Sequence, residues 1–150
     1  NLFSRIQYND LYVFAYILEN IPKVCGYIPE HFNRDKIGHL LAWYYRWQDI
    51  ASNDLITVYA MGEEDMAPRE VKAKVEEDLV NLGIKINHLY TYRKWKYFPH
   101  VDCEELKNGF HDKLEALQSK RNTYYTGEIM SFSIIEECLA YSVDLIDRFF

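Results

Sequence analysis

The residues best placed to do chemistry lie in the last thirty positions of this 150-residue sequence. Residues 122–126 form a β-favouring run, and the pair Gly127 and Glu128 follows it. Ser133 and Glu136 then have the serine-to-glutamate spacing of a capping box, which predicts a strand, a tight turn and a helix. This layout aims the free N–H groups and the positive dipole end of the helix at whatever lies above the strand. Such groups favour phosphate oxygens or the electron-rich carbonyl side of a flavin.

Length, charge and cysteine content narrow the class of protein. With 150 residues, 49% of them hydrophobic, the chain is long enough to bury a sizeable core. A net charge of −6 with dispersed basic residues argues against a nucleic-acid binder. The longest apolar stretch, residues 11–18, is far shorter than the roughly 20 residues of a membrane helix, so we expect no transmembrane segment. The three cysteines lack C-x-x-C pairing, which is typical of reduced thiols and predicts a cytoplasmic protein.

Several cofactor and catalytic motifs are missing from the sequence. Its six glycines are spread so that neither G-x-G-x-x-G nor a P-loop occurs. The sequence also lacks a G-x-S-x-G elbow, an H-E-x-x-H helix and an EF-hand loop. Its five histidines show no ligand spacing, so we predict no metal site. Without a dinucleotide fingerprint, the chain cannot hold the pyrophosphate of a cofactor in the usual way.

The pattern of apolar residues predicts an α+β fold, with a mixed or antiparallel sheet and packed helices. One helix is expected to start at Pro68 and to end before Gly83. A second is expected to follow Asp102 and to continue through Leu117, although Gly109 weakens it by about 1 kcal/mol. Strands are expected at residues 10–18, 38–47, 54–61 and 86–101, with residues 48–53 as the hairpin connection. The apolar residues of 38–47 would also make one face of a helix.

The apolar residues of the carboxy-terminal part are expected to be covered. The last helix would begin near Ser133 and bury a face at helical spacing: Ile135, Leu139, Ile146 and Phe150. Aromatic residues make up 16% of the chain, more than a minimal core needs. They fit either the wall of a cavity for a flat or unsaturated ligand, or a tyrosine-rich core and surface.

Several ordered runs resemble the flavin-dependent amine oxidase superfamily, and within it the polyunsaturated fatty acid isomerase branch of FAD-dependent oxidoreductases. The closing run YYTGEIMSFSIIEECLAYSVDLIDRFF is similar to the FAD-contacting signature at the carboxy terminus of those enzymes. Thr126 and Ser119 depart from the usual Ala and Gly, and neither change removes a backbone donor. Further similar runs occur in the same order: Gly38-His39-Leu40, Tyr45-Arg46-Trp47 followed by an acid, Trp95 with residues 97–101, and Arg148-Phe149-Phe150.

This resemblance implies that the chain is the carboxy-terminal part of a longer FAD-dependent flavoprotein. Residues 1–120 would then belong to the substrate-binding domain. Residues 121–150 would supply the last strand, turn and helix of the FAD-binding domain. The Rossmann-like dinucleotide fingerprint would lie upstream of Asn1, in a missing amino-terminal half that is the expected partner. The 150-residue chain alone is expected to be inactive.

The resemblance also implies a set of site residues, although it identifies no catalytic residue. Gly127 would allow close backbone approach to the cofactor. Glu128 would accept hydrogen bonds from a ribityl hydroxyl or from N–H groups around the pyrophosphate, unless it is an ordinary turn acid. Backbone N–H groups that would face the flavin C2 carbonyl belong to Ser133, Ile134 and Ile135. Candidate walls of the substrate cavity, each also explicable by core packing, are Trp95, Tyr97, Phe98 and Phe132.

The implied activity is the movement of a hydride between flavin N5 and an apolar, unsaturated fatty acid. An apolar, aromatic cavity suits a fatty acyl chain, but it also suits an amine or a carotenoid-like substrate. Two alternatives therefore stay open: a flavin-dependent amine oxidase fragment, and a stand-alone binding domain without catalysis.

Overall fold

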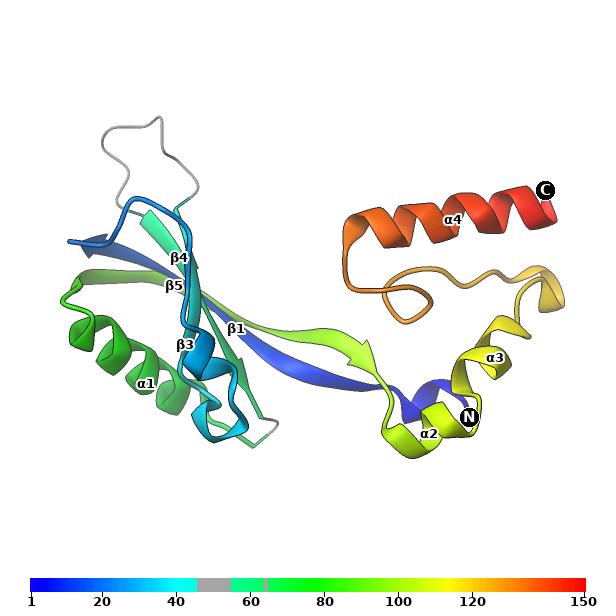
Figure 1. The fold of residues 1–150 in the computed structure, drawn as a ribbon, viewed down its shortest axis with the longest axis horizontal. Coiled ribbons are helices and arrows are strands. Elements are labelled where there is room, and N and C mark those ends of the chain that lie inside the picture. The colour runs from blue at the N-terminus through cyan, green and yellow to red at the C-terminus, as the bar shows by residue number, and fades with distance from the viewer. Residues whose placement is uncertain (46–54, 64) are drawn as a thin grey trace. The chain divides into compact units, whose positions relative to one another are not determined.

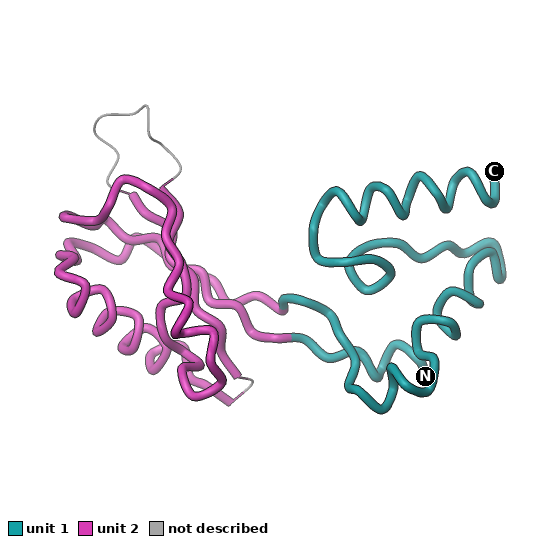
Figure 2. Tube along the Cα trace, in the orientation of Figure 1, with its two compact units in different colours: residues 1–8, 97–150 teal, residues 9–96 magenta. Residues whose placement is uncertain are grey.

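The structure, a computed structural model, describes residues 1–45, 55–63 and 65–150. The chain forms two compact units, which Figure 2 shows in teal and magenta. Unit 1 consists of residues 1–8 and 97–150, and unit 2 consists of residues 9–96. The predicted boundary at residue 120 concerns two domains of a larger protein and stays a prediction.

Unit 2 is built around a five-stranded sheet with the order β2-β3-β4-β1-β5, in which β1 and β4, β2 and β3, and β3 and β4 pair antiparallel. The α+β fold class predicted from the sequence is therefore confirmed. Each predicted strand segment up to residue 101 corresponds to an observed strand, whereas the expected connection at residues 48–53 lies outside the described residues. The strands are β1 (Gln7–Glu19), β2 (Gly26–Tyr27), β3 (Leu40–Tyr44), β4 (Leu55–Gly62) and β5 (Lys85–His100) (Figure 1).

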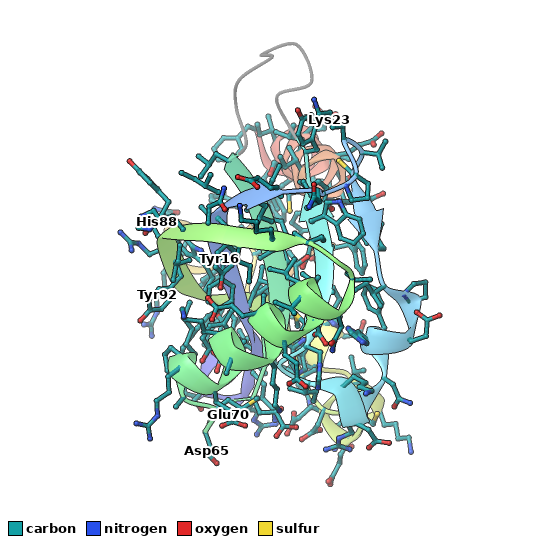
Figure 3. The ribbon with its side chains drawn as sticks, turned by 90° about the vertical axis from the view of Figure 1, so that its left-hand side faces the viewer. Tyr16, Lys23, Asp65, Glu70, His88 and Tyr92 are labelled. Carbon is teal, nitrogen blue, oxygen red and sulfur yellow. The ribbon has the colours of Figure 1, made fainter. Side chains whose placement is uncertain are left out.

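The core of unit 2 lies between this sheet and helix α1 (Pro68–Asn81). Side chains alternate between buried and less buried along β1 and β4, as expected for strands with one face in a core. Figure 3 looks onto α1, which lies across the sheet that carries Tyr16. Gly83 follows the helix with a φ of +77°, a conformation that favours glycine. The fully buried residues of α1 are Val71, Val75 and Leu79.

Unit 1 contains three helices: α2 (Cys103–Lys107), α3 (Phe110–Glu115) and α4 (Ile135–Phe149). The single helix expected from Asp102 to Leu117 is wrong, because Gly109 interrupts it with a φ of +71°. The predicted start is correct, since the Asp102 carboxylate accepts a hydrogen bond from the Glu105 N–H at 2.8 Å. The hydrophobic core of this unit is formed by Val101, Phe110 and Leu114, which pack with Leu2, Ile6, Leu117, Ile129 and Met130.

The strand predicted at residues 122–126 is not present in the described structure. Arg121 and Asn122 have positive φ values of 56° and 55°, within a short 3-10 helix. Tyr125 donates its N–H to Gln118 Oε1 at 2.8 Å, and its carbonyl accepts from Gln118 Nε2 at 2.7 Å. A side chain therefore takes the place of a neighbouring strand, and the segment forms no ladder.

The last helix begins two residues later than predicted. Ile134 is its N-cap, and no side chain caps the helix. Instead of capping, Ser133 Oγ donates a hydrogen bond to Glu128 Oε2 at 3.3 Å. The predicted capping box is therefore wrong, and the serine is used in the turn. None of the helices among the described residues has the length and apolar character that a membrane span needs.

Candidate functional site

The turn after residue 126 and the first turn of α4 enclose an open pocket of about 320 Å³, called here the turn pocket. Met130 N–H donates to the Gly127 carbonyl at 2.9 Å and closes the turn. Gly127 has a φ of +106°, and a Cβ built on it would meet no atom within 4 Å. The backbone at this glycine therefore faces open space. All five predicted cofactor-binding residues line the pocket: Gly127, Glu128, Ser133, Ile134 and Ile135.

Backbone donors are present at the turn pocket because the amino-terminal end of α4 is uncapped. Ile134 N–H is already used, since it donates to the Phe132 carbonyl at 2.8 Å. Among the described residues, the N–H groups of Ser133 and Ile135 have no hydrogen-bond acceptor. Two of the three predicted backbone donors are therefore free to bind a ligand.

A second pocket of about 190 Å³, called here the aromatic pocket, adjoins the turn pocket. Phe98 and Phe132 line it with rings that meet edge to face at a centroid distance of 5.5 Å. Phe98 has a φ of +55°, which is rare for an aromatic residue and costs about 1–2 kcal/mol. Glu128 and Ser133 line both pockets and are bonded to each other. These two polar side chains thus stand where the pockets meet.

Two of the four predicted substrate-wall residues are not part of the aromatic pocket. Tyr97 lies beside Phe98, with ring centroids 6.1 Å apart, but does not line the pocket. Trp95 belongs to unit 2 and is exposed to solvent.

His100 and His111 also line the aromatic pocket, and neither was predicted from the sequence to be a site residue. His100 Nδ1 lies 2.8 Å from the Phe98 carbonyl, which only accepts, so Nδ1 carries a proton and donates it. His111 packs edge to face against Phe110 at 5.4 Å. No sequence spacing predicts this pair, because His100 lies at the end of β5 and His111 lies in α3.

A polar network attaches α4 to the rest of unit 1. Tyr141 OH and Arg148 Nη1 each donate to the Glu115 carboxylate at 2.6 Å. Buried Gln118 donates to Tyr141 OH at 2.7 Å and also holds the backbone of Tyr125. The Tyr141 hydroxyl and the Arg148 guanidinium hold the pKa of Glu115 below its usual value. Burial, with the Glu115 carboxylate nearby, raises the pKa of Tyr141.

The apolar face of α4 is exposed, which contradicts its predicted burial. Within α4, Leu145 is the buried residue. The sequence pattern correctly identifies an apolar face, but none of the described residues covers it. The four residues predicted to be buried are exposed by 57% to 84%: Ile135, Leu139, Ile146 and Phe150.

Comparison with known proteins gives one extensive and one short similarity. A CLA-producing fatty acid isomerase from P. acnes is 35% identical to this chain, with a TM-score of 0.88. The similarity covers 99% of this chain and 36% of the isomerase, so the chain spans about a third of that protein. The FAD-dependent oxidoreductase oblC of Cochliobolus heterostrophus is 61% identical over 31 residues, which are 21% of this chain and 6% of the oxidoreductase.

No family model matches the sequence. The resemblance predicted from the sequence, to FAD-dependent oxidoreductases and in particular to fatty acid isomerases, is confirmed by these two similarities. Both similar proteins are named as enzymes.

Proposed function

We propose that this chain is the carboxy-terminal part of an FAD-dependent isomerase or oxidoreductase that acts on an unsaturated fatty acid. The observation that carries this proposal is the pair of adjoining pockets that share Glu128 and Ser133. One pocket offers backbone donors and the other offers an apolar, aromatic wall. Similarity to about a third of a fatty acid isomerase supports the same assignment.

The residues of the turn pocket fit part of a flavin cofactor. Free N–H groups of Ser133 and Ile135 are suited to donate to a ring carbonyl, and the open space at Gly127 leaves room for a flat group. Glu136 and Glu137 lie in the first turn of α4, where their charges oppose a phosphate more strongly than a neutral carbonyl. The pocket therefore favours the ring of FAD over its pyrophosphate. When bound, FAD accepts and returns hydride at the flavin N5.

The chain's own residues would then orient the substrate and exclude water. Phe98 and Phe132 present an edge-to-face aromatic wall that suits a hydrocarbon chain with double bonds. Glu128 would accept a hydrogen bond from a hydroxyl of the cofactor at the boundary of the two pockets. Apolar walls keep water from the reacting carbons.

The rest of the same polypeptide is the partner that this proposal requires. The exposed apolar face of α4 needs a cover, and the chain contains no phosphate-binding fingerprint of its own. We infer that the missing part supplies both. The 150-residue chain by itself is accordingly expected to retain little or no FAD.

The test compares substrates with the complete, FAD-loaded protein. Linoleate is expected to give conjugated-diene absorbance without release of peroxide, and a panel of amines is expected to give neither signal. Peroxide release with amines and no diene from linoleate would identify an amine oxidase instead. A complete protein that neither binds FAD nor converts any of these compounds would support a non-catalytic binding domain. The isolated chain, which should stay colourless with added FAD, is the control for adventitious flavin binding.

A further inference from the structure

Three potential metal ligands meet in unit 2, whereas both pockets described above are lined by residues of unit 1. His31 lies in a short 3-10 helix (Pro29–Phe32), His39 precedes β3, and Asp78 lies in α1. One ligand atom from each residue lies within 4.8 Å of the other two. Their side chains are only 15%, 20% and 11% exposed, respectively. The sequence showed no ligand spacing because the three residues come from three separate elements.

The distances within this cluster are those of a small coordination site. His39 Nδ1 lies 3.0 Å from Asp78 Oδ2, and His31 Nδ1 lies 3.8 Å from the same oxygen. Ligand atoms bound to zinc in a tetrahedron, with bonds of about 2.0–2.1 Å, lie roughly 3.3 Å apart. The two observed distances bracket that value. The imidazole rings are 5.2 Å apart and tilted by 55°, so they do not stack face to face.

The backbone around the cluster already orients its carboxylate. The Leu40 N–H donates to Asp78 Oδ2 at 2.9 Å, which fixes the carboxylate between α1 and the start of β3. Hydrogen bonds of this kind commonly orient the ligands of metal sites. One carboxylate and two neutral imidazoles also carry a net charge of −1, which suits a divalent cation.

Metal binding would require two local proton shifts, one on each imidazole. Without metal, His31 Nδ1 lies 2.8 Å from the Leu40 carbonyl and must donate to it. His39 Nδ1 donates to the Asp78 carboxylate in the same way. For both nitrogens to bind a metal, each proton moves to Nε2, and the imidazoles stay neutral. The lost hydrogen bonds weaken the site, so we expect micromolar rather than tighter affinity.

We propose that His31, His39 and Asp78 form a binding site for one divalent transition-metal ion, for which zinc is the type case. Three protein ligands leave a fourth position for water or another small ligand. This inference concerns unit 2 alone and is independent of the function proposed for unit 1.

Cobalt titration of the metal-free chain tests the site, because Co²⁺ reports its coordination by visible absorption. We expect one Co²⁺ per chain, with four-coordinate bands and no thiolate charge-transfer band, and displacement by Zn²⁺. Zn²⁺ should also raise the midpoint of thermal unfolding, as any ligand of the native state does. His31→Ala and His39→Ala are each expected to weaken binding about tenfold or more. His88→Ala, at an exposed position of β5 labelled in Figure 3, is the matched control and should bind as the unmodified chain does.

Two results would overturn the proposal. One is equal binding by the double variant His31→Ala/His39→Ala, and the other is a cobalt spectrum with thiolate bands, which would assign the metal to the free cysteines. Circular dichroism of each metal-free variant checks that it is folded. His31→Gln is a milder second variant, because its amide can still donate toward the Leu40 carbonyl. It should keep the fold and lose the cobalt bands.

Discussion

Glu128 is an acidic side chain that contributes to both the turn pocket and the aromatic pocket. Its carboxylate accepts from Ser133 Oγ. The side chain is exposed in this chain and lies outside the hydrophobic core. Its removal should therefore affect ligand binding far more than folding.

In the complete protein, Glu128→Ala is expected to weaken FAD binding about tenfold or more, because a hydrogen bond to a charged group contributes about 1.5–3 kcal/mol. The measurement is the ratio of flavin to protein absorbance after gel filtration. Glu104→Ala is the matched control, since Glu104 is also exposed but lines neither pocket. An unchanged ratio in the Glu128 variant would remove the role assigned to this residue.

The sequence predicts some of the residues that line the two pockets, but not all of them. Gly127, Glu128 and Ser133 are close along the chain, so a local pattern predicts that they meet. His100 and His111 line the same pocket although they come from β5 and α3, and no sequence spacing predicts that. The roles of these residues in binding stay predictions.

The donors of the turn pocket lie at the start of helix α4 and just before it, and Glu115 of α3 holds this helix in place through Tyr141 and Arg148. The pKa of Glu115 is lowered in the folded chain, first by the Tyr141 hydroxyl and then, despite some burial, by Arg148. A lowered carboxyl pKa stabilises the fold above the unfolded-state value of 4.5. That contribution is lost as the pH falls through the lower, folded-state pKa.

Acidification is therefore expected to destabilise the unmodified chain more than Glu115→Gln. The measurement is the urea unfolding midpoint at about pH 7 and at acidic values below about 4, where carboxylates take up protons. Asp147→Asn is the control, because Asp147 is an exposed acid of α4 without an ion pair among the described residues. Parallel acid sensitivity of all three proteins would show that Glu115 does not anchor the helix.

Among the elements, those specified by local periodicity were predictable from the sequence. Helix α1 has apolar residues at helical spacing, Pro68 at its start and Gly83 after its end, and it formed as expected. The strand at residues 122–126 was not predictable in this way, because β-propensity does not supply a pairing partner. At Gly109, by contrast, the apolar residues keep helical spacing on both sides, yet the left-handed backbone of this one residue separates α2 from α3.

At the scale of the whole molecule, the exposed apolar face of α4 allows a test of whether the rest of the complete protein covers this helix. Val143 and Ile146 are each 57% exposed and line neither pocket. Val143→Ser/Ile146→Ser should change the unfolding free energy of the isolated chain by only about 0.5 kcal/mol per site. In the complete protein the same two substitutions should lower the unfolding free energy by about 1–3 kcal/mol in total, because buried apolar area is lost. They should also lower the FAD content of the complete protein.

Chemical denaturation of both forms, with and without the double substitution, provides these numbers. The exposed pair Glu136→Gln/Asp147→Asn on the same helix is the control for altered α4 surface chemistry. Equal small losses in both forms would mean that the rest of the polypeptide does not cover α4.

The order of segments along the chain has a consequence for protein engineering. Unit 2 is a continuous segment, residues 9–96, whereas unit 1 is assembled from residues 1–8 and 97–150. Unit 2 is therefore an insertion, or cassette, within the sequence of unit 1. Exchanging this cassette for a counterpart from another protein requires only two splice points, both inside long strands. A recombinant library built on these junctions would vary one module while leaving the carboxy-terminal turn untouched.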